Sequence, residues 1–88
     1  MNRHKVKRNE FRLEDGGAVS IEYWTDPTNV RVAAFGADGH QISRAVYAAS
    51  VDGADVLNTQ IQESLIDSLA NALEYELINH PDIHVRKR

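Results

Sequence analysis

The histidines are the residues whose spacing first suggests chemistry. His80 and His84 stand four positions apart, a spacing that pairs of zinc ligands use, but zinc needs three or four ligands in a fixed geometry. The other two histidines, His4 and His40, fall in a predicted N-terminal arm and a predicted turn, and the chain has no cysteine. We therefore predict no metal site and interpret His80 and His84 as solvated residues around the end of a helix.

A second pattern resembles a calcium-binding loop, with Asp52 and Glu63 at its first and twelfth positions. Such a loop needs oxygen ligands and a glycine at set positions between them. Ala54, Val56 and Leu57 stand there instead. We attribute the match to chance.

Catalysis by a nucleophile is not supported either. No serine lies in a Gly-x-Ser-x-Gly context, and the glycines at 16–17 and 36–39 fit hairpins rather than a phosphate-binding loop. A chain of 88 residues also has little depth for a pocket that excludes water. The sequence predicts a protein that is not an enzyme and takes no cofactor and no small-molecule substrate.

Acidic residues gather on one side of the predicted C-terminal helix. Glu63, Asp67 and Glu74 fall within about 40° of one another at 100° per residue. No lysine or arginine occurs from position 45 to 85. Two interpretations stay open: a solvated face, neutralised in part by the basic chain ends, or a surface that docks a basic protein partner.

A mixed set of arginine and aromatic residues is predicted on the outer face of the sheet: Arg12, Trp24, Arg31, Phe35 and Arg44, with Ile42 and Val46. Arginine beside aromatic residues is typical of protein interfaces, and nucleic-acid-binding sheets use the same mixture. A third interpretation is a solvated face on which Glu10, Glu14 and Glu22 pair with the arginines.

These side chains depend on strands and a helix that the periodicity predicts. Alternating apolar residues predict strands around 11–13, 19–24, 30–35 and 41–49. Turn residues separate them, and we predict a two-residue type I′ turn at Asp38-Gly39. Pairing Leu13 with Val19, Tyr23 with Val30 and Val32 with Ala45 gives one apolar face. That face holds Phe11, Leu13, Val19, Ile21, Tyr23, Val30, Val32, Ala34, Ala45 and Tyr47.

The period then changes to 3.6 and predicts a helix from about 56–59 to 79, ended by Pro81. Thr59 with Gln62 resembles a capping box, and Asp55 and Asn58 are alternative caps. The apolar side of the helix comprises Ile61, Leu65, Ile66, Leu69, Ala70, Ala72, Leu73 and Leu77. We predict Leu69 and Ile21 at the centre of the core.

The predicted fold is therefore α+β: a four-stranded antiparallel meander with one long C-terminal helix packed on one face, a two-layer ββββα domain. We place this domain at residues 10–80, after a basic flexible arm at 1–9 and before a short basic tail at 81–88. The absence of cysteine and of an apolar run of about 18 residues predicts a cytoplasmic protein without a membrane partner.

The most consistent functional prediction is a small non-catalytic protein that inhibits or regulates a protein partner by occupying it, of the kind that phages and mobile elements carry. Surplus apolar surface on the helix and the outer sheet face also predicts a homodimer. The alternative is a nucleic-acid-binding module that uses the outer sheet face and the basic arm.

Overall fold

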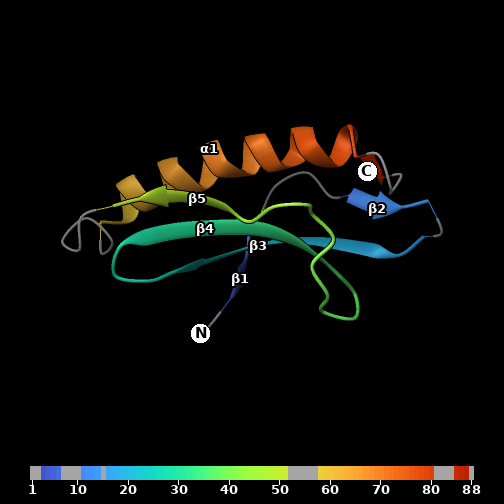
Figure 1. The fold of residues 1–88 in the computed structure, drawn as a ribbon, viewed down its shortest axis with the longest axis horizontal. Helices are drawn as coiled ribbons and strands as arrows, with labels where there is room; N and C mark the ends of the chain where they lie inside the picture. Colours follow the sequence, from blue (N-terminus) through green and yellow to red (C-terminus); the bar gives the residue numbers. More distant parts are fainter. Residues whose placement is uncertain (1–2, 7–10, 15, 52–57, 81–84, 88) are drawn as a thin grey trace.

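The computed structural model describes residues 3–6, 11–14, 16–51, 58–80 and 85–87. One long helix lies along one face of an antiparallel sheet (Figure 1). The elements in chain order are β1 (His4–Lys5), β2 (Phe11–Leu13), β3 (Ala18–Thr25), β4 (Asn29–Gly36), β5 (Tyr47–Ser50), α1 (Thr59–Ile78) and β6 (Val85–Lys87). Strands β2 to β5 form the predicted meander and the helix follows them, so the α+β ββββα fold is confirmed.

Two short strands extend this sheet. The order is β5-β4-β3-β2-β6, and β1 pairs with β3. Because β4 occupies one edge of β3, β2 and β1 share the other edge: β2 lies beside residues 18–19 and β1 beside residues 22–23. Parts of the segments that the sequence assigns to an arm and a tail thus lie in the sheet.

The turn between β4 and the chain after it differs from the predicted type I′ turn. Gly39 donates its N–H to the carbonyl of Gly36 at 3.0 Å and has φ of 84°. A type I′ turn needs positive φ at both central residues, and among the described residues only glycines have positive φ. Asp38 does not have the positive φ that a central residue needs, so the turn is not of type I′. The loop is a three-residue one, in which a tight turn is followed by a left-handed glycine.

The hairpin of β2 and β3 also has a three-residue loop that ends in a left-handed glycine. Gly16 donates to the carbonyl of Leu13 at 2.9 Å and has φ of 92°, and Leu13 donates to the carbonyl of Gly17 at 2.8 Å. Phe11 consequently pairs with Val19, whereas the predicted pairing of Leu13 with Val19 would set Phe11 opposite Ile21.

The longer loop at Gly39 changes the direction of the residues that follow it. Phe35 now bridges Gln41, and Ile42 donates to the carbonyl of Ala34 at 2.8 Å. This odd shift turns Ile42 onto the inner face, where it packs against the core, so its predicted place on the outer face is wrong. A bend at residues 43–45 follows, and the predicted strand at 41–49 is reduced to β5.

The remaining register differences preserve the predicted inner face. Tyr23 pairs with Val32, and Val32 with Tyr47, so each pairing is displaced by two positions from the predicted one. An even displacement leaves every side chain on its own face. Ala45, in the bend and exposed, is the exception.

The turn between β3 and β4 is organised by one carboxylate. Asp26 Oδ1 accepts from the N–H groups of Thr28 at 2.9 Å and Asn29 at 2.8 Å, and Oδ2 lies 3.1 Å from Arg31 Nε. The Thr28 N–H above all, with Arg31, lowers the pKa of Asp26 to about 2.

The N-cap of the helix lies one residue before the one that the capping box predicts. Asn58 Oδ1 accepts from the N–H groups of Gln60 and Ile61, so Asn58 is the cap, as the alternative prediction had it, and Thr59 is the first helical residue. The residues buried against the sheet are Ile66, Ala70, Leu73 and Leu77. Leu73 is fully buried, whereas Leu69 only packs beside the core and is not its centre; Ile21, at 6% exposure, is in the core as predicted.

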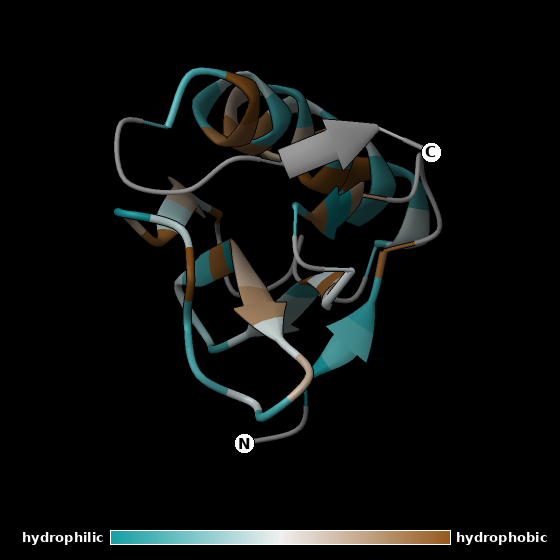
Figure 2. Ribbon diagram, turned by 90° about the vertical axis from the view of Figure 1, so that its right-hand side faces the viewer, coloured by the Kyte–Doolittle hydropathy of each residue, from teal (hydrophilic) through white to brown (hydrophobic). Residues whose placement is uncertain are grey.

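The view along the long axis shows the helix as one layer and the strands as the other (Figure 2). The core lies between them and is formed by Phe11, Ile21, Val32, Ala34, Ala70, Leu73 and Leu77. Within the described part of the chain, no helix has the length and apolar character to cross a membrane.

Candidate functional site

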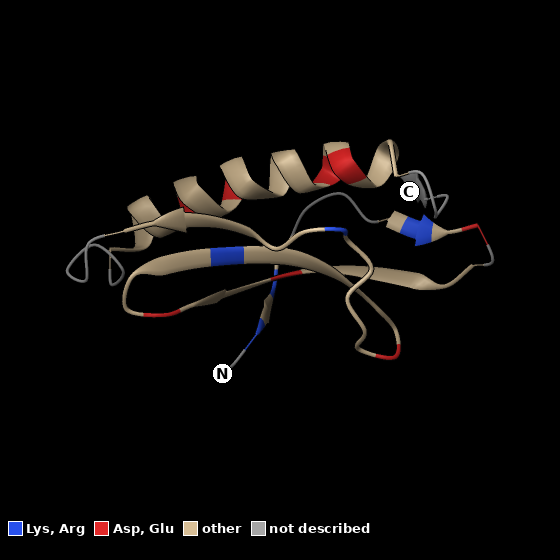
Figure 3. Ribbon diagram, viewed as in Figure 1, with Lys and Arg blue, Asp and Glu red and all other residues tan. Residues whose placement is uncertain are grey.

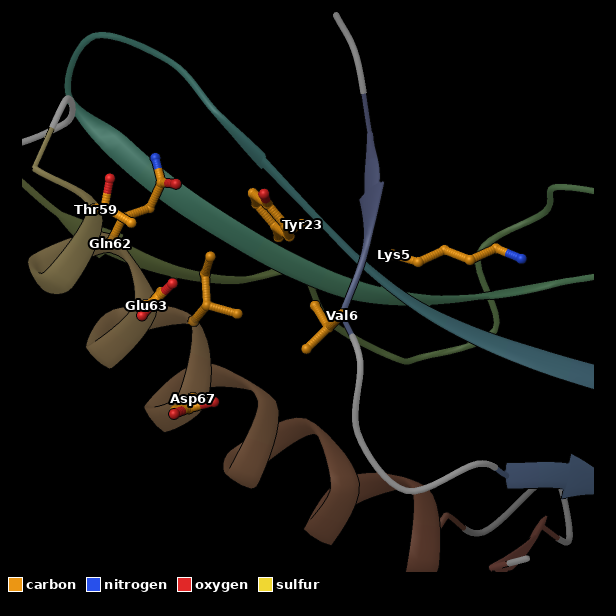
Figure 4. Close-up of a pocket in the computed structure, with 8 residues that line it drawn as sticks. Lys5, Val6, Tyr23, Thr59, Gln62, Glu63 and Asp67 are labelled. Carbon is orange, nitrogen blue, oxygen red and sulfur yellow. The ribbon is translucent and has the colours of Figure 1, made fainter.

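A groove lies between the first half of α1 and the strands β1 and β3 (Figure 4). It encloses about 370 Å³ and is lined by Lys5, Val6, Tyr23, Thr59, Gln62, Glu63, Ile66 and Asp67. Tyr23 of β3, with Lys5 and Val6 of the N-terminal segment, supplies one wall, and the helix supplies the other.

The bottom of the groove is apolar and its helix side is acidic. Val6 and Tyr23 pack against the core, Ile66 is 7% exposed, and the His4 ring lies 5.2 Å from the Tyr23 ring, centroid to centroid. Glu63 and Asp67 are exposed on the helix side. Figure 4 shows the Lys5 ammonium pointing away from both carboxylates. The groove thus combines an apolar floor with a negatively charged rim.

Helical spacing explains the acidic rim. Asp67 follows Glu63 by one turn, and Glu74 follows Asp67 by about two turns, so all three carboxylates lie on the flank of α1 that faces the groove. Acidic residues occur along the helix without lysine or arginine (Figure 3). The structure brings Glu63 and Asp67 together at the groove, while the half-buried Glu74 lies beyond it on the same flank.

The opposite flank carries a carboxylate that the sequence analysis did not single out. Glu76 Oε1 accepts from the backbone N–H of Arg44 at 3.0 Å and from the Tyr47 hydroxyl at 3.1 Å, and it also accepts from the N–H of Ala45 at 3.3 Å. Glu76 therefore fastens the helix to the bend at residues 43–45. Burial, together with this hydrogen bond to Glu76, raises the pKa of Tyr47.

On the outer sheet face, Phe35 is covered rather than exposed. It is 5% exposed; its ring centroid lies 6.1 Å from that of Trp24 and 3.9 Å from the guanidinium carbon of Arg3. Arg3 also pairs with Glu22 at 3.5 Å. Trp24 and Phe35 thus form a small cluster over which the Arg3 guanidinium lies, and the aromatic surface is smaller than the sequence predicts.

The three predicted arginines do not lie together. Arg12 lies beside Ala18 and Arg31 beside Trp24, so about 20 Å of β3 separates them at 3.3 Å per residue. Arg44 is in the bend beside the C-terminal half of α1, on the other side of the sheet. A continuous basic surface for a phosphate backbone is therefore not assembled from these three residues, and the nucleic-acid alternative stays a prediction.

Metal-ligating side chains do not converge in the described residues, which hold no group of three or more histidine, aspartate or glutamate residues suited to an ion. His40 Nδ1 lies 2.9 Å from Asp38 Oδ2, and this contact raises the pKa of His40. His84 lies outside the described residues, as do Asp52 and the remainder of the calcium-like loop before Asn58.

Comparison of the chain with protein-family models, with curated proteins and with solved structures found no match.

Proposed function

We propose that this protein is a non-catalytic binding protein that regulates or inhibits a basic protein partner by occupying its surface through the acidic flank of α1. The observation that carries the proposal is the groove, whose apolar floor at Val6, Tyr23 and Ile66 lies beside the carboxylates of Glu63 and Asp67.

This combination suits a lysine or arginine side chain of a partner. The alkyl stem of such a side chain can pack on Val6 and Ile66 while its charged end reaches a carboxylate. The face of the Tyr23 ring can also attract the charged end of such a side chain through a cation–π interaction. Because Glu74 continues the negative flank beyond the groove, several basic residues of one partner can be engaged at once.

Negative charge along one flank also accelerates encounter with a basic partner. A partner whose basic surface binds nucleic acid would lose that ligand while the protein covers it. A cytoplasmic location and an origin in a phage or mobile element stay predictions from the sequence.

A peptide rich in arginine and labelled with a fluorophore tests the proposal directly. We expect the intact protein to bind it at about 50 mM salt and more weakly at about 300 mM, because exposed charges are screened. Glu63→Lys with Asp67→Lys should abolish binding. Nuclear magnetic resonance shifts on adding the peptide should centre on Tyr23 and Ile66.

The matched control is Glu14→Lys, which reverses an exposed acidic residue in the β2–β3 turn, away from the groove. If this single charge reversal weakened binding of the peptide as strongly as Glu63→Lys alone does, binding would reflect net charge only and the groove would not be the site. Absence of binding at low salt would contradict the proposal outright.

A further inference from the structure

Strand β5 is an edge strand with unpaired backbone groups. It pairs with β4 on one side, and no other strand among the described residues pairs with it. Val51 donates its N–H to the carbonyl of Thr28 at 2.9 Å, which places Val51 in a hydrogen-bonded pair. Since such pairs alternate along an antiparallel ladder, Tyr47 and Ala49 also face β4. The N–H and C=O groups of Ala48 and Ser50 therefore point to the open edge.

This edge lacks the features that usually prevent strand pairing. Lysine, proline or a charged residue on an edge strand blocks the approach of another strand, and Tyr47–Ser50 contains none of them. The strands on the other side of the sheet differ, because β1 includes Lys5 and β6 includes Arg86 and Lys87. Among the edge strands that the structure describes, β5 alone combines four residues with no charge.

The flank of α1 above β5 is apolar before Glu76 and extends this edge. Leu65 and Ala72 precede Glu76 by about three turns and one turn, so they lie on the flank that Glu76 attaches to the bend next to β5. Ala72 is exposed, Ile61 near the same flank is 37% exposed, and Val46 just before β5 is 38% exposed. The edge and the flank together form an uncharged strip, which we call the β5 strip: Val46, Tyr47–Ser50, Ile61, Leu65 and Ala72.

We propose that a second copy of this chain docks on the β5 strip, with the two β5 strands antiparallel about a twofold axis at Ala49. In this register the outward N–H and C=O groups of Ala48 pair with those of Ser50 in the second copy. By the twofold symmetry, Ser50 of the first copy pairs with Ala48 of the second in the same way. The two sheets then form one continuous sheet, and the apolar flanks of the two helices face each other across the axis.

The distribution of charge favours the β5 strip over the acidic flank of α1 as the face that meets a second copy. The chain carries a net charge of −3, and its helix carboxylates at Glu63, Asp67 and Glu74 lie on the flank away from β5. Two copies that meet at the β5 strip keep these carboxylates on opposite outer sides of the dimer. A strand of another protein could pair with the β5 backbone, but it would not bring the matching apolar helix flank.

The first experiment measures the mass of the intact protein by light scattering at about 100 µM, well above the dissociation constant of an ordinary dimer. We expect twice the mass of the chain. Ala48→Pro should give a monomer, because it removes an N–H that points outward and leaves the pairing with β4 intact. Ala72→Lys should also give a monomer, whereas Ser64→Lys, on the solvent side of α1, should stay dimeric.

A cysteine scan fixes the register, since the natural chain has no cysteine. In the proposed dimer Ala49 lies opposite Ala49 in a non-hydrogen-bonded pair, whose Cα separation of about 4.5 Å permits a disulfide. Ala49→Cys should therefore form a covalent dimer within minutes of mild oxidation, and Ser64→Cys should not. This result decides the question even if Ala48→Pro fails to fold.

A monomeric wild type at about 100 µM would overturn the proposal, as would a dimer that neither Ala48→Pro nor Ala72→Lys dissociates. Equal cross-linking of Ala49→Cys and Ser64→Cys would show random collision and overturn it too. These outcomes are independent of peptide binding at the groove, which lies on the other flank of α1.

Discussion

The two flanks of α1 use the same kind of residue in opposite ways. On the β5 flank, the Glu76 carboxylate accepts hydrogen bonds from two backbone N–H groups and the Tyr47 hydroxyl. On the groove flank, Glu63 and Asp67 are exposed beside an apolar floor. A glutamate thus becomes part of the scaffold where the chain brings donors to it, and is exposed at the surface where it borders a groove. The neighbourhood of a carboxylate, rather than its position in the helix, decides between the two.

A substitution on the buried face of α1, which lies between the two flanks, should have the largest effect on stability. Leu73 is fully buried, so Leu73→Ala should lower the free energy of unfolding by about 2–5 kcal/mol through lost burial and the cavity left behind. Ile78 is 62% exposed, and Ile78→Ala should change it by less than about 0.5 kcal/mol. Urea unfolding of both variants measures the difference. Equal losses would mean that α1 is not packed on the sheet in this orientation.

The flanks themselves are compared by removing one carboxylate from each. Glu76→Ala should lower the free energy of unfolding by about 1–3 kcal/mol, because the N–H groups of Arg44 and Ala45 and the Tyr47 hydroxyl lose their acceptor. Glu63→Ala should be neutral or slightly stabilising, since it removes a like-charge pair with Asp67. Thermal melting at pH 7 distinguishes them. A loss at Glu63 as large as that at Glu76 would erase the contrast between the flanks.

Sequence periodicity was sufficient for the fold and for the groove-side carboxylates. Alternation places Ile21 and Val32 on the inner face despite the differences in pairing, because those displacements are even. Helical spacing alone puts Glu63 and Asp67 on one side of the helix. The position of Ile42 could not be predicted in this way. It depends on whether Asp38 adopts positive φ, and a one-residue change in the loop reverses the face.

Contacts between segments far apart in the chain were beyond the reach of local patterns. Glu76 binds the bend at residues 43–45, more than thirty positions away, and nothing in the helix sequence separates Glu76 from the other acids. The burial of Phe35 depends on Arg3, from a segment whose composition predicts only a basic arm. The groove was missed for the same reason, since Val6 lines it from the N-terminal segment.

High pH should lower the stability that the contact between Tyr47 and Glu76 contributes. The pKa of Tyr47 is raised by burial and by Glu76, so its protonated form is favoured in the folded state. Its contribution is complete below pH 10, the ordinary value, and is lost as pH rises through the higher folded value. Tyr47→Phe should remove that dependence, and Tyr75→Phe, at a residue that is 73% exposed, should leave it in place. Urea unfolding between about pH 8 and 11 checks this; equal behaviour of the two variants would contradict it.

Asp26 in the β3–β4 turn, which lies on neither flank, should contribute to the loss of stability in acid. The folded pKa of Asp26 is about 2, below its ordinary 3.8, so its stabilisation is complete above about pH 4 and is lost as pH falls toward 2. Asp26→Asn should lower stability slightly at pH 7 and flatten its decline in acid, while Glu14→Gln should leave the wild-type profile. A steep decline that persists in Asp26→Asn would assign the acid sensitivity to carboxylates elsewhere.

The pairing of β2 with β6 has a consequence for the order in which the molecule assembles. It joins Phe11 to Lys87, the widest sequence separation among the strand pairs that the structure describes, whereas β3 and β4 are joined by a short turn. The entropy lost on closing a chain loop grows with its length, so contacts between distant segments form late and slowly. The β3–β4 hairpin is thus suited to nucleate folding, and the closure of β6 onto β2 should be a late event in refolding.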